Sequence, residues 1–269
     1  MEQILHTVLE AGLEKPVRIL QVTDVHLVEY SDQDPVDQQE LLKRRRETFR
    51  KEGGYPPHTQ NEYLEEAFRI AEEQDALLVI TGDAMDLNSD GNHREFRRIT
   101  AGKDFMFTPG GHEFQRICKR VLDEPADYYP GARARVAAAF PELKLTFDSR
   151  VVGGVNVITM DNSVDYFQAE ILDALEKEVQ KGLPMVLFMH DPLHDKALLH
   201  IAGIPLQRPT DEEYRISDQV IELIGTCPLV LATFAGHYHS EQETIAPCGA
   251  KVYVTPGLFK GIARMIEIR

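Results

Sequence analysis

Five short apolar segments of this chain are each followed by acidic or histidine residues, and this pattern constrains the fold more than any other feature. Segments such as Val17–Val22 and Met185–Met189 have the length and composition of buried strands. Helical patterns alternate with them, for example over 61–74, which predicts an α/β arrangement. The residues that follow the apolar segments are Asp24 and His26, Asp83, His112 and Glu113, His190, and His237 and His239.

These polar residues are expected to meet in one place, because ligands of open α/β sheets bind in the crevice beyond the carboxyl ends of the strands. A single Asp or His in such a position has an ordinary explanation as a turn residue or a satisfied polar group. Five strand ends with the same ligand chemistry instead indicate a shared site. Imidazole and carboxylate ligands together suit Mn, Fe, Zn or Co better than Ca or Mg.

The candidate residues could supply ligands for two metal ions. Asp24 and His26 are separated by one residue, so in an extended segment both side chains face the same way. His237 and His239 have the same spacing, although a loop can also direct these two imidazoles to two different ions. The two carboxylate oxygens of Asp83 are able to bridge a pair of cations. Composition therefore favours a two-metal site.

Taken in order, these motifs resemble the calcineurin-like metallophosphoesterase superfamily. They are DVH (24–26), GDAMD (82–86), GGHE (110–113), His190 after a buried strand, and GHYH (236–239). The resemblance implies a four-layer α-β-β-α sandwich, in which two mixed β-sheets pack face to face with helices on the outside. The segment from MDNS (160–163) to FMHDP (188–192) further resembles the cyclic-nucleotide phosphodiesterase-like branch.

The resemblance also implies a role for eight residues. The implied metal ligands are Asp24, His26 and His239 for the first ion, His190 and His237 for the second, and Asp83 as the bridge. His112 is implied as general acid or charge stabiliser, and Asp86 as the residue that orients its imidazole. Two such cations, with Mn or Fe favoured, lower the pKa of a bound water so that hydroxide attacks phosphorus. A protonated His112 then donates to the leaving alkoxide.

One position departs from the family pattern. The third block normally reads Gly-Asn-His-Asp/Glu, and this chain has Gly111 in place of the asparagine. The missing amide oxygen predicts weaker binding of the second metal and reduced turnover. The sequence Gly91-Asn92-His93 imitates the lost block, but no strand precedes it, and we interpret it as a polar loop.

The predicted function is a dinuclear-metal hydrolase of a small-molecule or nucleotide phosphate ester, either a phosphodiesterase or a phosphatase. One alternative is a metal-binding scaffold with weakened catalysis, supported by Gly111. Another is a nuclease, which the formal net charge of −15 disfavours because an acidic surface repels polyanions. The basic run 43–46 either contacts a phosphate or forms a solvated helix face, and the flanking Glu40 and Glu47 favour the second interpretation.

The remaining features predict one domain over 1–269 in a reduced, cytoplasmic compartment. No apolar run approaches the roughly 20 residues that cross a bilayer, the N-terminus lacks the pattern of a signal peptide, and three cysteines are too few for a disulfide framework. The polar segment at about 29–60 is expected to be an insertion or a lid. Substrate specificity is expected from this segment and from loops at 125–130 and 194–209.

Overall fold

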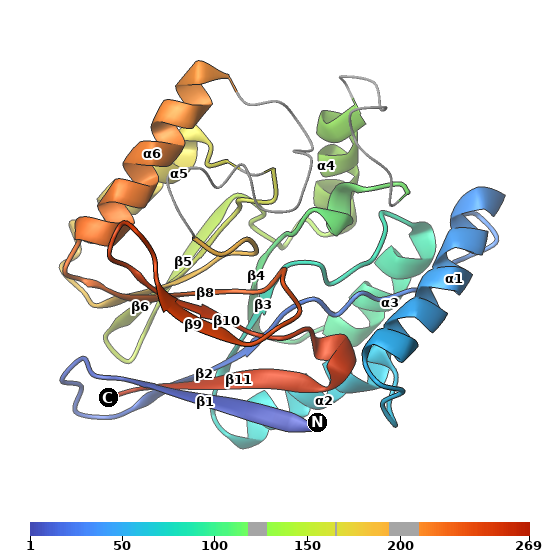
Figure 1. Ribbon diagram of the computed structural model, residues 1–269, viewed down its shortest axis with the longest axis horizontal. Helices are drawn as coiled ribbons and strands as arrows, with labels where there is room; N and C mark the ends of the chain where they lie inside the picture. The colour runs from blue at the N-terminus through green and yellow to red at the C-terminus, as the bar shows by residue number, and fades with distance from the viewer. Residues whose placement is uncertain (118–127, 165, 194–209) are drawn as a thin grey trace.

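The computed structural model describes residues 1–117, 128–164, 166–193 and 210–269, and two β-sheets form its centre (Figure 1). The first sheet has five strands in the order β1-β11-β2-β3-β4. Their bounds are β1 Gln3–Leu9, β2 Val17–Val22, β3 Leu77–Thr81, β4 Phe105–Thr108 and β11 Ile262–Ile268. Strands β2, β3 and β4 run parallel, whereas β11 pairs antiparallel with β2. The carboxyl ends of β2, β3 and β4 therefore meet at one edge of the sheet.

The second sheet has six strands in the order β5-β6-β7-β8-β10-β9. Their bounds are β5 Phe147–Val152, β6 Val155–Met160, β7 Met185–Phe188, β8 Val230–Ala235, β9 Gln242–Ile245 and β10 Lys251–Val254. The four central strands are parallel, and β5 and β9 are antiparallel edges. The sheet is thus mixed, as predicted, and β7 and β8 end side by side.

The two sheets pack face to face through one apolar core. Its buried residues come from both sheets, among them Ile19, Val79 and Ile266 from the first and Val157, Phe188 and Phe234 from the second. Because most strands bury both faces, they are near-continuous runs of apolar residues rather than alternating ones. This is why short apolar segments were sufficient to predict the central strands.

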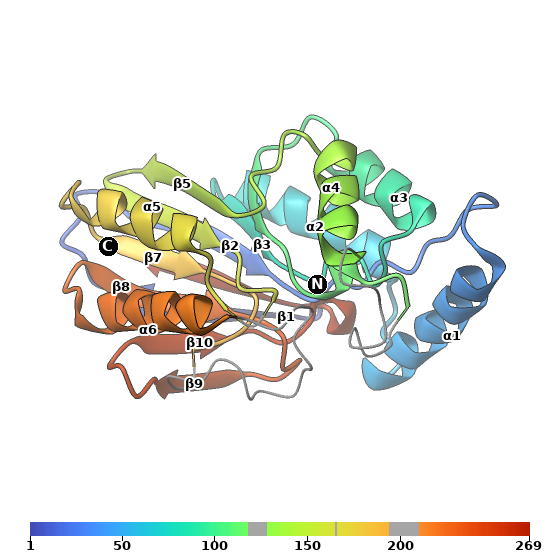
Figure 2. The same ribbon diagram turned by 90° about the horizontal axis from the view of Figure 1, so that it is seen from above.

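Helices cover the outer face of each sheet (Figure 2). The first sheet is covered by α2 (Gln60–Glu73), α3 (Asp90–Thr100) and α4 (Tyr128–Ala139), which contribute to a second apolar core. The second sheet is covered by α5 (Ala169–Val179) and α6 (Asp211–Thr226), with a third core beneath them. The predicted α-β-β-α sandwich is therefore confirmed.

Helix α1 (Val36–Glu52) lies in the segment that was expected to be an insertion or lid. In Figure 1 it stands apart from α5 and α6, at the opposite side of the molecule. Leu42 and Phe49 of α1 are buried, and they pack in a small apolar cluster with Phe259. Phe259 belongs to the 3₁₀ turn Leu258–Lys260, which directly precedes β11. Helix α1 is therefore anchored to the body of the fold.

Two expectations about local structure were wrong or incomplete. The Gly91-Asn92-His93 sequence is not a loop but the first turn of α3, where the side chain of Ser89 caps the helix by accepting from the Asn92 amide. Strand β1 was not predicted, because its residues alternate between exposed and buried and lack a continuous apolar run. Within the described ranges, none of the helices is long and apolar enough to cross a membrane.

Candidate metal centre

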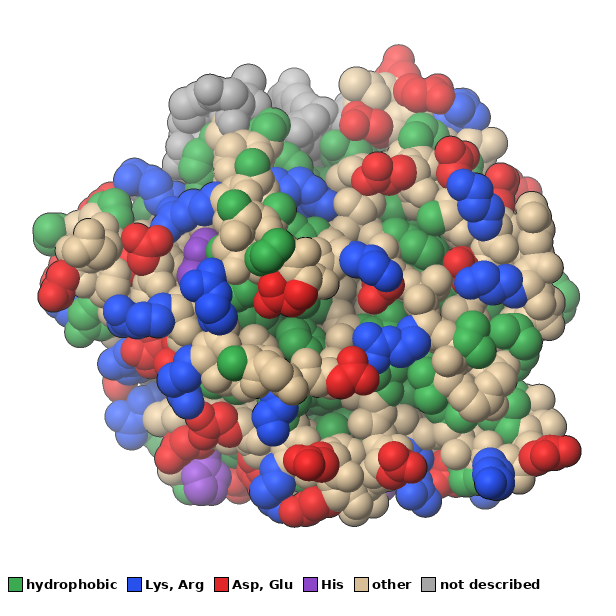
Figure 3. All heavy atoms as spheres, turned by 180° about the vertical axis from the view of Figure 1, so that it is seen from behind, with side chains coloured by type: hydrophobic (Ala, Val, Ile, Leu, Met, Phe, Trp, Pro, Cys, Tyr) green, Lys and Arg blue, Asp and Glu red, His purple; other side chains and the backbone are tan. Residues whose placement is uncertain are grey.

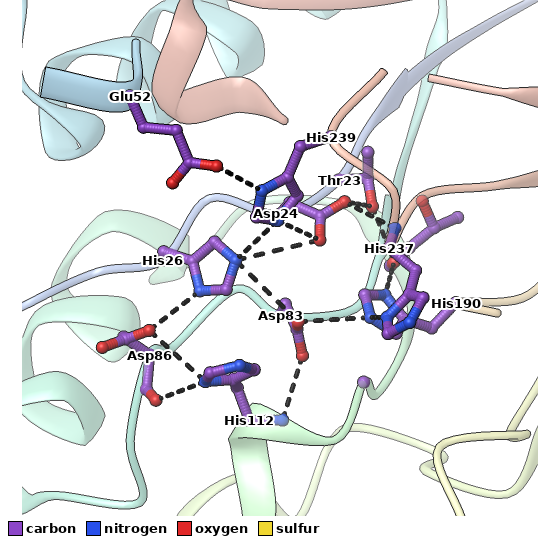
Figure 4. A network of polar contacts seen from close by, with 12 residues as sticks. Thr23, Asp24, His26, Glu52, Asp83, Asp86, His112, His190, His237 and His239 are labelled. Carbon is purple, nitrogen blue, oxygen red and sulfur yellow. Dashed lines mark hydrogen bonds and ion pairs between the residues drawn. The ribbon is translucent and has the colours of Figure 1, made fainter. Parts of the chain in front are cut away.

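The eight residues predicted to form the site come together where strand ends of the two sheets meet (Figure 4). Loops after β2, β3 and β4 carry one set, and loops after β7 and β8 carry the other. The first set is Asp24, His26, Asp83, Asp86 and His112, and the second is His190, His237 and His239. The parallel pairing within each sheet brings these loops to one edge, as the sequence pattern predicted.

The loops from the two sheets touch directly. The backbone amide of His237 donates to Asp24 Oδ2 at 2.9 Å. This approach depends on Gly236, since a Cβ at that position would lie 1.8 Å from Thr23 Oγ1 and 2.4 Å from Asp24 Oδ2. A glycine before the first histidine of the last motif therefore has a clear steric purpose.

Five of the site residues hold backbone conformations that side chains other than glycine rarely adopt. Their φ angles are 48° for Asp24, 51° for His26, 50° for Asp83, 69° for His237 and 51° for His239. Only Tyr55 and Asp75 share this property among the other non-glycine residues that the structure describes. Strain of this kind persists where the surrounding structure fixes it, and it concentrates at functional sites.

A first group of donors consists of Asp24, His26 and His239. The Nε2 atoms of the two histidines lie 3.2 Å apart, and Asp24 Oδ1 lies 3.2 Å from His239 Nε2 and 3.8 Å from His26 Nε2. The other ring nitrogens face outward: His26 Nδ1 is 3.0 Å from Asp86 Oδ1, and His239 Nδ1 is 3.4 Å from Glu52 Oε1. Carboxylates behind the imidazoles fix their orientation, as is common around metal-binding histidines.

A second group lies beside it. His190 Nε2 is 3.2 Å from Asp83 Oδ2 and 3.4 Å from His237 Nδ1, and Asp191 Oδ1 is 3.3 Å from the same His237 nitrogen. Asp83 Oδ2 also lies 3.8 Å from His26 Nε2, which belongs to the first group. The Asp83 carboxylate therefore stands between the two groups of donors.

The chemistry of this donor set fits metal ions. Asp24 Oδ1 is buried and has no hydrogen-bond donor among the described residues, although two imidazole nitrogens lie within 3.8 Å of it. A buried carboxylate oxygen without a donor is costly unless a cation satisfies it. Groups of donor atoms within 4.8 Å of one another include Asp24–His26–His239, Asp24–Asp83–His190 and His190–Asp191–His237. These residues could hold two ions.

His112 lies next to the donors rather than among them. Its Nδ1 is 2.8 Å from the Asp86 backbone oxygen and 3.3 Å from Asp86 Oδ1, so Asp86 orients the imidazole through both groups. The Asp86 carboxylate is fully buried and receives two hydrogen bonds of 2.8 Å from Arg45 of α1. The basic run was interpreted as a solvated helix face, and for Arg45 this was wrong.

Glu113 organises the loops beneath the site. It is fully buried and accepts hydrogen bonds from the backbone amides of Asp83, Met85 and Gly110, at 2.7–2.9 Å. Burial, together with the nearby charge of Asp83, raises the pKa of Glu113 to about 7. This residue links the loop after β3 to the loop after β4, so it fixes the backbone that carries Asp83.

In the site without metal, burial and the neighbouring charges shift the pKa values of the carboxylates and imidazoles. Burial opposes ionisation of Asp24, but its interaction with His239 and the charge of His190 lower its pKa to about 2. Burial also opposes the charged form of His190, but Asp83 raises the pKa of that imidazole well above 6.5. Burial lowers the pKa of His26, which favours the neutral form that binds metals.

Sequence reasoning missed several residues of the site. Asp191 directly follows His190, and its position after a strand end was a usable signal. Arg45 and Glu52 lie on α1, and nothing in the local sequence indicates that this helix faces the strand ends. His194 and most of the predicted specificity loops, 125–127 and 194–209, lie outside the described residues.

Gly111 has an ordinary right-handed conformation, with φ −66° and ψ −34°. Its backbone therefore does not require glycine, and an asparagine could adopt this conformation without backbone strain. Asn92, from the sequence that resembles the family block, does not replace the missing metal ligand. It is fully buried, its side-chain oxygen accepts from the Glu29 amide, and its side-chain nitrogen donates to the Leu87 carbonyl.

Comparison with known proteins gives a family match and similar solved structures. The family model described as calcineurin-like phosphoesterase matches residues 17–241. A dimetal phosphatase from Danio rerio has a similar structure, with 13% identity, a TM-score of 0.54, and coverage of 91% of this chain and 88% of that one. A putative 5′-nucleotidase from Staphylococcus aureus aligns with 15% identity and a TM-score of 0.45 over 90% of this chain and 49% of its own. No curated protein matches the sequence.

Proposed function

This chain belongs to the calcineurin-like phosphoesterase family and is a metal-dependent phosphoester hydrolase, and on that premise we propose that it uses two metal ions to cleave small-molecule phosphate esters such as nucleotides. The observation that carries the proposal is the position of Asp83 Oδ2, 3.2 Å from His190 Nε2 and 3.8 Å from His26 Nε2. A carboxylate between two groups of donors is suited to bridge two cations.

We assign the ligands by the group in which each donor lies. Asp24, His26 and His239 would hold the first ion, His190 and His237 would hold the second, and Asp83 would contribute to both. Mn or Fe is the favoured occupant, because the donors are imidazole and carboxylate. When bound, such a pair supplies a nucleophile at neutral pH and positive charge for the phosphoryl oxygens.

His112 is the proposed general acid. A carbonyl oxygen only accepts, so the 2.8 Å contact with the Asp86 backbone oxygen requires a proton on His112 Nδ1. A proton transferred to the leaving group therefore comes from Nε2. Asp86 and Arg45 hold the imidazole in place during this transfer, because the Asp86 carboxylate is itself fixed by two hydrogen bonds from the guanidinium.

The charge of the protein supports a small substrate over a nucleic acid. The formal net charge is −15, and acidic and basic side chains are interspersed over the described part of the face in Figure 3. Nucleic-acid binding depends on basic side chains that neutralise successive phosphates. A nucleotide or another small ester needs only the metal centre and a few neighbouring groups.

The test is hydrolysis of two generic esters, p-nitrophenyl phosphate and bis-p-nitrophenyl phosphate, by one purified sample whose metal content is measured. We expect two metal ions per chain and Mn-dependent hydrolysis that EDTA abolishes. Faster cleavage of the diester supports the phosphodiesterase assignment, and faster cleavage of the monoester supports a phosphatase. Bound metal without turnover of either ester, after Mn, Fe, Co and Zn have been supplied, would favour the scaffold alternative that Gly111 suggests.

A further inference from the structure

In two histidines of the candidate metal centre, one ring nitrogen faces the other donors and the opposite nitrogen contacts the group that orients the ring. His26 directs Nε2 toward the other donors and Nδ1 toward Asp86 Oδ1, at 3.0 Å. His190 directs Nε2 toward Asp83 and Nδ1 toward the Thr81 carbonyl, at 2.9 Å. In both residues the inner nitrogen faces the site, and the orienting group contacts the opposite nitrogen.

Asp191 does not follow the pattern of an orienting group. The inner nitrogen of His237 is Nδ1, which lies 3.4 Å from His190 Nε2. Asp191 Oδ1 lies 3.3 Å from that same Nδ1, so it is on the inner side of the imidazole. The donor atoms of His190, Asp191 and His237 all lie within 4.8 Å of one another.

The backbone that carries Asp191 is firmly held. Asn162 Oδ1 accepts hydrogen bonds from the amides of both His190 and Asp191, each at 3.1 Å. Asn162 Nδ2 donates to the Asp191 carbonyl at 2.7 Å. Only 9% of the Asp191 side chain is exposed, and Asn162 is fully buried. Asn162 thus fixes the backbone of His190 and Asp191, and both side chains point toward the second group of donors.

The second group needs another donor, because Gly111 provides no side chain. Without Asp191 it offers His190, His237 and the shared Asp83, whereas the first group offers Asp24, His26 and His239 in addition to Asp83. We propose that Asp191 is a direct ligand of the second metal ion and replaces the amide that family members have at position 111. The inference rests on the two-metal site of the proposed function.

The experiment is a Mn²⁺ titration of the metal-free full chain, followed by equilibrium binding and by the EPR signal of an exchange-coupled Mn pair. In Asp191→Ala we expect the first ion to bind as in the wild type. We expect affinity for the second ion to fall by more than about 100-fold, beyond the 10–100-fold typical of orienting residues, and the coupled signal to disappear. Asp218→Ala, an exposed change on α6, is the matched control.

A rescue variant separates loss of a ligand from general damage. Adding Gly111→Asn to Asp191→Ala supplies an amide oxygen at the family position, and we expect it to restore the second ion and the coupled signal. The isosteric Asp191→Asn variant keeps a side-chain oxygen that can bind a metal, so it should lose less affinity for the second ion than Asp191→Ala does. Unchanged binding of the second ion in Asp191→Ala would overturn the proposal, as would rescue failure in a double variant that still binds the first ion.

The proposed function can fail separately. A wild-type chain that binds two Mn²⁺ ions but hydrolyses no ester contradicts the activity and leaves the Asp191 result interpretable. A wild-type chain that never shows a coupled pair contradicts the two-metal site and this inference with it. Normal hydrolysis with an unaffected second ion in Asp191→Ala contradicts the Asp191 assignment alone.

Discussion

The two groups of donors in this protein are supported in different ways. Behind the first group, His26 and His239 are each backed by a carboxylate, from Asp86 and Glu52. Phe49 of α1 also stacks on His26, with ring centroids 4.3 Å apart. Behind the second group, His190 is backed only by a backbone carbonyl in the described contacts, that of Thr81.

This difference teaches where the site tolerates change. The first group depends on the contacts of α1, an element outside the two sheets, so its donor side chains are held in place without a metal. The second group has no contact with α1 among the described ones, since His190 is held by the Thr81 carbonyl and Asp191 by Asn162. We therefore expect the first ion to bind tightly and the second to be the one that variation weakens.

The largest effect is expected where both groups meet. Asp83→Asn removes the shared negative charge, so hydrolysis should fall by at least about 1,000-fold, because the metal pair contributes several kcal/mol to the transition state. Metal content and bis-p-nitrophenyl phosphate hydrolysis check this together. Asp218→Asn makes the same chemical change on an exposed surface and should be neutral. Retained activity in Asp83→Asn would exclude the bridging role.

The next effect concerns a residue in neither group. His112→Asn should lower kcat by about 10²–10⁴-fold, as expected for loss of general acid catalysis, while both ions remain bound. In steady-state kinetics, kcat should fall further for a diester with a leaving group of high pKa than for a nitrophenyl diester, because the poorer leaving group depends more on protonation. Loss of metal in this variant would mean that His112 is a ligand and that the division into two groups is incomplete.

Arg45 tests the support of the first group. Arg45→Ala removes the two hydrogen bonds that the guanidinium donates to the buried Asp86 carboxylate, so we expect a 10–100-fold loss of first-ion affinity and of activity. Arg45→Lys should be intermediate, since an ammonium cannot form the bidentate contact. Lys43→Ala, on the same helix but exposed, is the matched control. Equal effects of Arg45→Ala and Lys43→Ala would show that α1 contributes only charge.

Metal uptake should depend on pH. Asp83 raises the pKa of His190 well above 6.5, so at pH 6.5 the metal-free imidazole is charged and an incoming ion must displace its proton. Affinity should therefore increase as pH rises toward this pKa, by up to about tenfold per unit for one proton released, and level off above it. Calorimetry in buffers of different ionisation enthalpy measures that proton. Affinity that does not change from pH 6 to 8 would contradict this account.

The smallest effect is expected from restoring the family residue. Gly111→Asn should tighten the second ion several-fold, since the right-handed backbone at this position accepts asparagine. Gly110→Ala, at the preceding position, should have the opposite effect. Its Cβ would lie 2.3 Å from Asp83 Oδ1, so binding of both ions should weaken. If Gly111→Asn leaves metal stoichiometry and rate unchanged, this position does not limit the site.

The sequence predicted the central strands and the clustering of the donor residues because the same physical cause produces both. A strand buried on both faces is a continuous apolar run, and the residues after β2, β3, β7 and β8 are polar where the runs end. The strand predicted at Val17–Val22 has the bounds of β2, and the one predicted at Met185–Met189 ends one residue earlier, at Phe188. The sandwich of two sheets came from the family resemblance rather than from these patterns.

The features that the sequence did not predict depend on tertiary contacts. Arg45 lies in a basic run whose local surroundings favour solvent, and only the packing of α1 turns its guanidinium toward Asp86. Asn92 seemed to lie in a loop because no strand precedes it, but Ser89 caps a helix there. Asp191 follows a strand end, as the predicted donors do, but only the structure shows that it lies on the inner side of the His237 imidazole. The cytoplasmic location and the identity of the metals stay predictions.

The most direct test of the two-ion centre is a crystal structure of the Mn²⁺-loaded protein with anomalous scattering data collected at the Mn edge. We expect two anomalous peaks about 3.5–4 Å apart, one among Asp24, His26 and His239 and one beside His190 and His237, with the Asp83 carboxylate between them. A single peak, or two peaks that do not share Asp83, would contradict the account.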